Sequence, residues 1–209
     1  MSKGINMNQY LVSSAAERPD FAAIAEWIPK GASVLDLGCG DGSLLRYLKE
    51  ARFVRGYGVE INDVDIVMCI ANGVNVIQND LESGLSDFED DSFDFVILSQ
   101  TLQATRHTEA LINEMLRVGH EGIVSFPNFG YWKSRLGVLR GNMPVSKELP
   151  YQWYDTPNVH LCTLHDFETF CRKKGVAILD RRVMAGGLEM KLLPNLLGST
   201  AVYRFQRGI

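Results

Sequence analysis

The stretch Val34-Leu-Asp-Leu-Gly-Cys-Gly-Asp-Gly-Ser43 combines a short apolar run with three closely spaced glycines, and a helical pattern begins directly behind it. The run predicts a buried strand, and the glycines predict a tight turn into a helix. Because glycine has no Cβ atom, the backbone of this turn can approach a ligand closely. The helix N-terminus adds N–H groups that have no partner within the helix. The stretch therefore predicts a ligand-binding turn.

The spacing of the glycines and the charges around them narrow the choice of ligand. A dinucleotide-binding turn has the form G-x-G-x-x-G, but here the glycines alternate with other residues and Ser43 stands at the third glycine position. The Gly-Lys-Ser/Thr end of a Walker A loop does not follow. Asp36 and Asp41 place negative charge beside the turn, which favours a cationic ligand. A tight turn without any ligand is the alternative that this motif alone leaves open.

The pattern Asp36-x-Gly38-x-Gly40-x-Gly42 resembles the first motif of class I S-adenosylmethionine-dependent methyltransferases. The cofactor of that family carries a positively charged sulfonium and an ammonium group, in agreement with the acidic residues of the turn. The resemblance implies that Asp36, Gly38 and Gly40 contact S-adenosylmethionine or S-adenosylhomocysteine.

The next two predicted strands support this interpretation, because each leads to an acidic residue. Glu60 ends a strand roughly 20 residues after the glycines, the distance expected of an acid that binds ribose hydroxyls, and Ile61 follows it in the predicted site. Asp80 follows the third strand. In the methyltransferase pattern an Asp at this place contacts the adenine amino group, and the next backbone N–H, here that of Leu81, contacts a ring nitrogen. Either acid alone could be a solvated strand end, but three strand ends in the correct order favour a cofactor site.

The alternation of strand and helix patterns predicts an α/β fold. Such repetition gives parallel strands joined by right-handed crossovers. We expect a Rossmann-like class I methyltransferase fold, with a mostly parallel seven-stranded sheet, an antiparallel edge strand and helices on both faces. The expected strands cover residues 34–37, 56–60, 74–77, 93–98, 122–126, 176–183 and 199–205.

The length of 209 residues predicts one domain over residues 1–209. Within it we expect a helical leader over residues 1–30 and a long loop or lid over residues 127–163. Loops of that length are commonly functional. The aromatic and basic residues between Tyr131 and Tyr154 favour a substrate lid or a protein-contact surface.

Three polar residues follow the buried strand at 93–98, namely Ser99, Gln100 and Gln103. Ligands of open α/β sheets bind outside the carboxyl ends of the strands, so these residues are further site candidates. Capping of the next element is their alternative role.

Catalytic residues are harder to identify from the sequence. The N-P-P-Y/F signature of amide and exocyclic-amine methyltransferases is absent after residue 98. His107, His160 and His165 could act as bases, although a cap or a structural hydrogen bond is the alternative for each. We retain His160 as the catalytic candidate.

The composition argues against several kinds of partner. Hydrophobic residues at 46% and charged residues at 22% are typical of a soluble globular protein. A net charge of −4 gives no general attraction to phosphate backbones, so we expect no nucleic acid partner. No apolar run approaches about 18 residues and no signal sequence is apparent, so we expect no membrane association. The four cysteines form no C-x-x-C pair, which predicts reduced thiols, no metal site and a cytoplasmic location.

Three stretches beyond the glycine turn are also distinctive. They are Ser99-Gln-Thr-Leu-Gln-Ala104, Ser125-Phe-Pro-Asn-Phe-Gly130 and Trp153-Tyr-Asp-Thr-Pro-Asn-Val-His-Leu-Cys-Thr163. These stretches resemble the MetW family of methionine biosynthesis proteins, and the resemblance runs from about Val34 through the last strands. It implies a class I methyltransferase fold with homoserine O-acyltransferase as the partner, but it supplies neither a methyl acceptor nor an oligomeric state.

Two functions of different classes follow. The favoured one is an S-adenosylmethionine-binding protein of methionine biosynthesis that acts with or regulates homoserine O-acyltransferase. The alternative is a catalytically active methyltransferase for a small-molecule acceptor. A dinucleotide-dependent oxidoreductase is a third hypothesis, which the spacing of the glycines and Ser43 disfavour.

Overall fold

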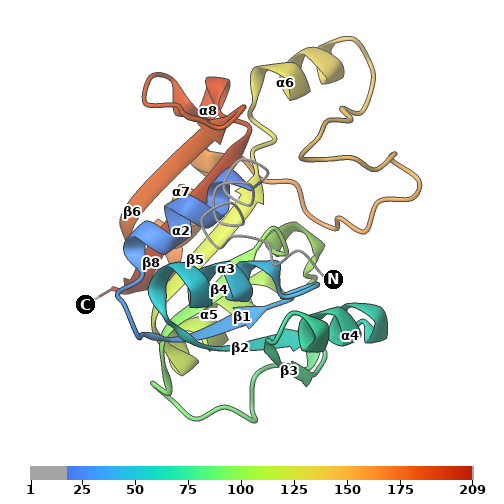
Figure 1. Cartoon of the computed structure of the whole chain (residues 1–209). Helices are drawn as coiled ribbons and strands as arrows, with labels where there is room; N and C mark the ends of the chain where they lie inside the picture. The colour runs from blue at the N-terminus through green and yellow to red at the C-terminus, as the bar shows by residue number, and fades with distance from the viewer. Residues whose placement is uncertain (1–17, 209) are drawn as a thin grey trace.

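The computed structural model describes residues 18–208, whose strands join one mixed sheet in the order β3-β2-β1-β4-β5-β8-β6-β7 (Figure 1). The strands are β1 (Ser33–Leu37), β2 (Arg55–Glu60), β3 (Asn75–Gln78), β4 (Phe93–Ser99), β5 (Gly119–Pro127), β6 (Val176–Ala185), β7 (Leu188–Glu189) and β8 (Thr200–Arg207). The helices are α2 (Pro19–Trp27), α3 (Ser43–Arg52), α4 (Asp63–Ala71), α5 (Thr108–Val118), α6 (Trp132–Leu139), α7 (Leu164–Lys174) and α8 (Pro194–Leu197), with short 3₁₀ turns η1 (Leu81–Ser83) and η2 (Leu102–Ala104).

The sheet confirms the predicted fold class, with two differences in detail. Strands β1 to β5 are parallel to one another, and β8 runs antiparallel between β5 and β6 rather than at the edge. An eighth strand, β7, pairs antiparallel with β6 and forms the edge. It exists because Gly186 and Gly187 adopt positive φ angles of 57° and 83°, which suit a two-residue hairpin turn.

Helices cover both faces of the sheet, as the sequence predicts. Helices α2 and α3 lie in front of the sheet in Figure 1, and they pack on Val34, Ile97 and Ile123. Helices α5 and α7 pack on the other face, against residues such as Leu98 and Phe126. Because side chains alternate along a strand, Asp36, Ser99 and Ser125 share the α2/α3 face with the apolar residues two positions before them.

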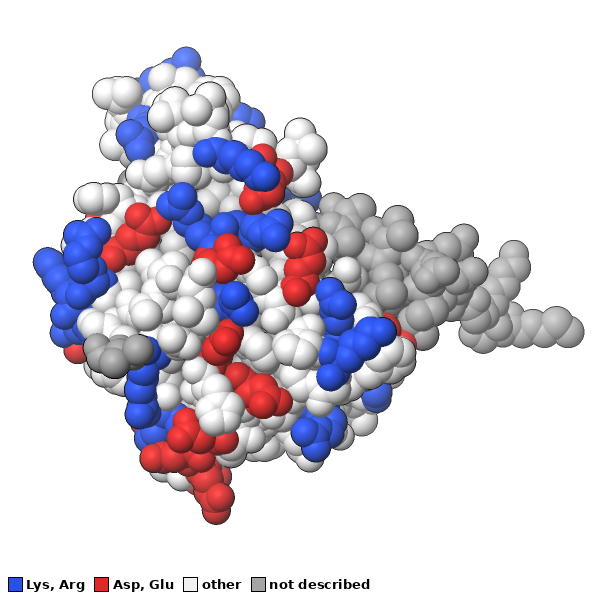
Figure 2. Space-filling view, turned by 90° about the vertical axis from the view of Figure 1, so that its left-hand side faces the viewer, with Lys and Arg blue, Asp and Glu red and all other residues white. Residues whose placement is uncertain are grey.

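Charged side chains lie along the β6 side of the sheet. On the β6 side, Arg182 pairs with Glu26 at 2.9 Å and lies 3.7 Å from Glu189. Figure 2 shows this side of the molecule, where basic and acidic side chains are interspersed. No helix in the described part of the chain is long and apolar enough to cross a membrane.

The segment predicted as a long loop over residues 127–163 contains one helix, α6. Only Ser134 of this helix is fully buried, so its sequence lacks the apolar periodicity that would have predicted it. Helix α7 then begins with the capping box that the sequence pattern indicates: Thr163 accepts a hydrogen bond from Asp166 N, and the Asp166 side chain accepts one from Thr163 N.

Candidate functional site

The glycine turn between β1 and α3 is held at the carboxyl end of the sheet by hydrogen bonds to β2. Gly38 N and Cys39 N both donate to Val59 O, at 2.8 and 3.1 Å. Gly38 has a φ of 66°, and a Cβ atom there would lie 2.8 Å from Thr101 Cγ2. Gly40 also has a positive φ, of 54°, but a Cβ atom there would meet nothing within 4 Å. Gly38 therefore allows close packing, whereas Gly40 faces open space.

Glu60 connects this turn to the start of α4. Its Oε2 atom accepts a hydrogen bond from Gly40 N at 2.9 Å. Its Oε1 atom accepts from Ile61 N at 2.8 Å and from Asn62 N at 3.0 Å. The Cys69 thiol of α4 adds a second connection by donating to Gly40 O at 3.0 Å. The structure thus brings Gly40, Glu60 and Ile61 together, as predicted for one site.

Asp36 lies beneath the turn and is 2% exposed. Its Oδ1 atom is buried and has no hydrogen-bond partner in the described structure. Desolvation raises the pKa of this carboxyl to about 8; Glu60 and Asp20 add to that rise, and Arg18 opposes it. A buried carboxyl without a partner is costly. A cationic ligand such as a sulfonium or ammonium group would favour the charged form of Asp36 and so offset this cost.

A buried polar network links the start of α2 to the ends of β4 and β5. Arg18 forms two hydrogen bonds with Asp20, at 3.0 and 2.8 Å. The Ser99 hydroxyl lies 3.1 Å from both Arg18 Nη2 and Asp20 Oδ2, and also 3.1 Å from the Ser125 hydroxyl. Ser99 is therefore placed in the site region as predicted, but sequence reasoning missed Arg18 and Asp20. Asp20 itself could have indicated this network, because it is an acidic residue on the same buried face of α2 as Ile24 and Trp27.

Backbone conformation marks the end of β4 as a special position. Gln100 has a φ of 55°, which is uncommon for a residue other than glycine. Its backbone N–H donates to Ser125 O at 2.9 Å and lies 3.1 Å from the Ser125 hydroxyl. Such strained positions cluster at functional sites, and the membership of Gln100 in the site stays a prediction.

The remaining predicted residues lie on the β3 side of the turn. Asn79 N donates to Glu60 O at 3.1 Å, so the ends of β2 and β3 adjoin. Ile61 is 58% exposed and could cover a flat ligand ring. Asp80 is exposed, and its side chain caps η1 by accepting from Glu82 N at 2.9 Å. Leu81 packs against the apolar core.

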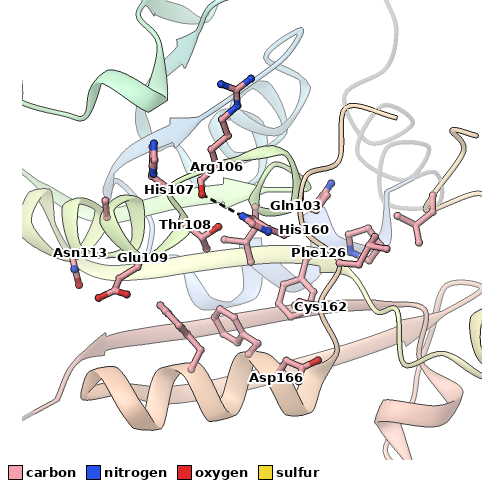
Figure 3. A pocket seen from close by; sticks show the side chains of 17 residues that line it. Gln103, Arg106, His107, Thr108, Glu109, Asn113, Phe126, His160, Cys162 and Asp166 are labelled. Atoms are coloured by element: carbon pink, nitrogen blue, oxygen red, sulfur yellow. Dashed lines mark hydrogen bonds between the residues drawn. The ribbon is translucent and has the colours of Figure 1, made fainter. Parts of the chain in front are cut away.

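Two cavities open near the carboxyl ends of β4 and β5, on different faces of the sheet. The first, of about 540 Å³, is lined by residues that include Arg18, Asp20 and Gln100. The second, of about 690 Å³, lies between α5 and α7. Figure 3 shows His160 at this second cavity, where its Nε2 atom lies 3.3 Å from Arg106 O. His160 is therefore placed apart from the glycine turn.

The strand order, the acidic glycine turn and the acid at the end of β2 define a class I methyltransferase-like protein. A solved S-adenosylmethionine-dependent methyltransferase from Thermotoga maritima, described as a possible histamine N-methyltransferase, matches with a TM-score of 0.66 and 20% identity. The match covers 96% of this chain and 95% of that one. Magnesium protoporphyrin IX methyltransferase from Synechocystis PCC 6803, solved with bound SAH, matches with a TM-score of 0.64 and 18% identity. This match covers 99% of this chain and 90% of that one. These likenesses confirm the fold.

Sequence comparison identifies the family. The family profile described as "Methionine biosynthesis protein MetW" matches residues 18–205. A protein from Rhodopirellula baltica, named bifunctional methionine biosynthesis protein MetXA/MetW, is 38% identical over 203 residues. That alignment covers 90% of this chain but 32% of the relative, so the chain spans about a third of the relative's length. The chain belongs to the MetW family of methionine biosynthesis proteins, as the sequence motifs predict.

Proposed function

We propose that this protein binds S-adenosylmethionine or S-adenosylhomocysteine at the carboxyl ends of β1 to β4. The observation that carries the proposal is Asp36, whose buried oxygen lacks a partner at the end of the strand that leads into the glycine turn. The methyltransferase-like fold supports it. The residues proposed to hold the cofactor are Asp36, Gly38, Gly40, Glu60, Ile61, Asp80, Leu81 and Ser99.

Each part of this site would recognise a different part of the cofactor. The carboxyl of Asp36 faces the positive charge, and Gly40 leaves the space above the turn free. Glu60 would accept a ribose hydroxyl with the lone pair of Oε2 that its three backbone donors leave unused. The bound cofactor would supply an activated methyl group. A thermal-shift titration with S-adenosylmethionine tests this part, and an unchanged melting temperature at millimolar cofactor would contradict it.

We further propose that the protein acts with, or regulates, homoserine O-acyltransferase in the cytoplasm. The MetXA/MetW relative supports this proposal, because it joins two named proteins of methionine biosynthesis in one chain. S-Adenosylmethionine is made from methionine, so occupancy of the site could report methionine supply to the partner. The test measures acyl transfer from acyl-CoA to homoserine with and without this protein, at several S-adenosylmethionine concentrations. We expect the rate to depend on both additions, and an unchanged rate without co-purification would contradict the association.

A second candidate function is methyl transfer to a small-molecule acceptor. The 540 Å³ cavity beside Asp20 and Gln100 favours it, because this cavity lies on the same face of the sheet as Asp36 and could admit an acceptor. The segment 127–163 would then serve as a lid. His160, the predicted base, lines the 690 Å³ cavity on the other face of the sheet, so this reaction would need a base other than His160, or none. A screen for product formation from labelled cofactor distinguishes this function from the first.

A further inference from the structure

Helix α6 and the segment that follows it expose many large apolar side chains. Figure 1 shows both of them standing away from the sheet. The exposed apolar residues are Trp132, Val138, Leu139, Met143, Val145, Tyr151, Trp153 and Tyr154. Single apolar residues are normal on a protein surface, whereas a contiguous group of them marks an interaction site.

Two adjoining hollows make this group contiguous. A groove of about 440 Å³ lies between α6 and the residues after it, and its lining includes Trp132, Met143 and Val145. A smaller hollow beside it is lined by Trp153 and also by Met143. Because both hollows share Met143 and Pro144, residues 131–154 form one continuous surface, which we call the α6 surface.

The α6 surface is basic, although the whole chain has a net charge of −4. Residues 131–147 contain no Asp or Glu, and their four basic residues, all exposed, are Lys133, Arg135, Arg140 and Lys147. Within residues 18–208, none of the four forms an ion pair. Since charges across an interface are complementary, these unpaired cations indicate an acidic partner.

The side chains in and beside the groove favour a protein over a nucleic acid as that partner. Single-stranded nucleic acids bind by stacking their bases on aromatic rings. Much of the α6 surface is instead aliphatic, as at Leu139, Met143 and Val145, and such side chains offer no stacking face. Apolar side chains of a protein partner fill hollows of this kind. Lys133 and Arg140 line the same groove and could pair with acids beside such an apolar residue.

We propose that the α6 surface binds homoserine O-acyltransferase, through an acidic surface of that enzyme that places an apolar side chain in the 440 Å³ groove. This inference rests on the proposed function, which supplies the partner. The same segment continues into the wall of the 540 Å³ cavity, where Lys147 and Tyr151 lie with Asp20 and Gln100. The bound enzyme would therefore lie beside the proposed cofactor site, where it could respond to occupancy.

The test measures binding of the full chain to purified homoserine O-acyltransferase by calorimetry, at low and at high salt. Lys133→Glu/Arg140→Glu should weaken binding by about tenfold or more and reduce its salt dependence, because it replaces two attractions with two repulsions. Arg172→Glu/Lys173→Glu is the matched control, since it reverses the same two residue types at exposed positions in the last turn of α7. The control should bind as the unmodified protein does, and circular dichroism melting checks that both variants fold.

A second pair of variants tests the groove itself. Val145→Asp places a charge in the apolar lining and should weaken binding about fivefold or more. Val67→Asp makes the same change at an exposed valine of α4 and should leave binding unchanged.

The outcomes separate this inference from the proposed function. If the enzyme binds the unmodified protein and the folded Lys133→Glu/Arg140→Glu variant equally, the assignment of the α6 surface is wrong while the association stands. If the enzyme does not bind the unmodified protein, the association fails and the inference falls with it. Binding of polythymidine or of phosphatidylglycerol vesicles that this variant loses, while it keeps the enzyme, would assign the surface to a nucleic acid or a membrane and overturn the proposal.

Discussion

The two sites at the carboxyl end of the sheet are built from opposite kinds of interaction. The glycine-turn site, formed around Asp36, Gly40 and Glu60, is polar, and its geometry depends on backbone hydrogen bonds. The cavity between α5 and α7 is apolar, and its wall residue Phe126 stacks on Tyr203 with a ring separation of 5.8 Å. Substitutions in the first site should therefore alter ligand affinity. Substitutions in the second should mainly alter the stability of the fold.

The largest effect is expected for Phe126→Ala. Phe126 is 1% exposed, and removal of a buried phenylalanine costs about 3–5 kcal/mol. Chemical denaturation should show this loss in the free energy of unfolding. Leu139→Ala, at a residue that is 84% exposed, is the control and should change stability by less than about 0.5 kcal/mol. A similar loss for both variants would remove the contrast between the two sites.

The next effect concerns affinity at the polar site. Glu60→Ala should lower S-adenosylmethionine affinity by about 1.5–3 kcal/mol, or roughly ten- to a hundredfold, because it removes charge-assisted hydrogen bonds. It should also lower the melting temperature, since three backbone N–H groups lose their acceptor. Isothermal titration calorimetry measures the affinity, with the exposed Glu89→Ala as control. Unchanged binding to a folded Glu60→Ala protein would contradict the proposed ribose contact.

Two glycine substitutions sharpen the comparison within the turn. Each would force a side chain onto a left-handed backbone, at a cost of about 1–2 kcal/mol. Gly38→Ala should be the less stable protein, because its Cβ atom would also press on Thr101. Gly40→Ala should instead weaken cofactor binding, because its Cβ atom enters open space above the turn. Thermal unfolding and calorimetry on both variants measure the two effects, and identical behaviour would show that the space above Gly40 is not used.

The smallest expected effect, counted per pH unit, is the dependence of the free energy of unfolding on pH. The pKa of Asp36 is raised to about 8 in the folded protein, well above its value in an unfolded chain. The folded state therefore retains a proton that the unfolded state loses, and stability should fall as pH rises from about 5 to 8, by at most about 1.4 kcal/mol per pH unit. Denaturation of the unmodified protein and Asp36→Asn at pH 5, 6.5 and 8 tests this. Equal slopes for the two proteins would contradict the role of Asp36.

The same carboxyl provides a binding signal. A cationic ligand favours the charged form of Asp36, so binding near pH 7 should release up to one proton. Calorimetry in two buffers with different heats of ionisation measures this release, and Asp36→Asn should abolish it.

The polar site could be predicted from the sequence because its parts are local. The Asp36 to Gly42 turn is one continuous stretch, and Glu60 follows at the spacing that one strand–helix–strand unit imposes. The apolar cavity could not be predicted, because residues as far apart as Leu102 and Phe170 meet only after α5 and α7 pack on the sheet. Arg18 and Asp20 were missed for the same reason, since their partner Ser99 is about eighty positions away.

Helix starts could also be predicted from the local sequence. Asn62 caps α4 by accepting from Val64 N and Asp65 N, as its position before an acidic first turn predicts. Strand β7 carried no such signal, because two residues are too few for a periodic pattern and only Gly186 and Gly187 mark the turn. The division into leader, core and lid remains a prediction, as does the assignment of individual site residues.

The lack of a partner for the buried Asp36 oxygen has a consequence for the protein in a living cell. Under the proposed function, the empty molecule is the more fragile form, and occupancy at a hundredfold excess over Kd would protect it by about 2.7 kcal/mol. Chains without cofactor would then be the first that proteases degrade. The amount of this protein could thereby follow the abundance of S-adenosylmethionine without any change in gene expression.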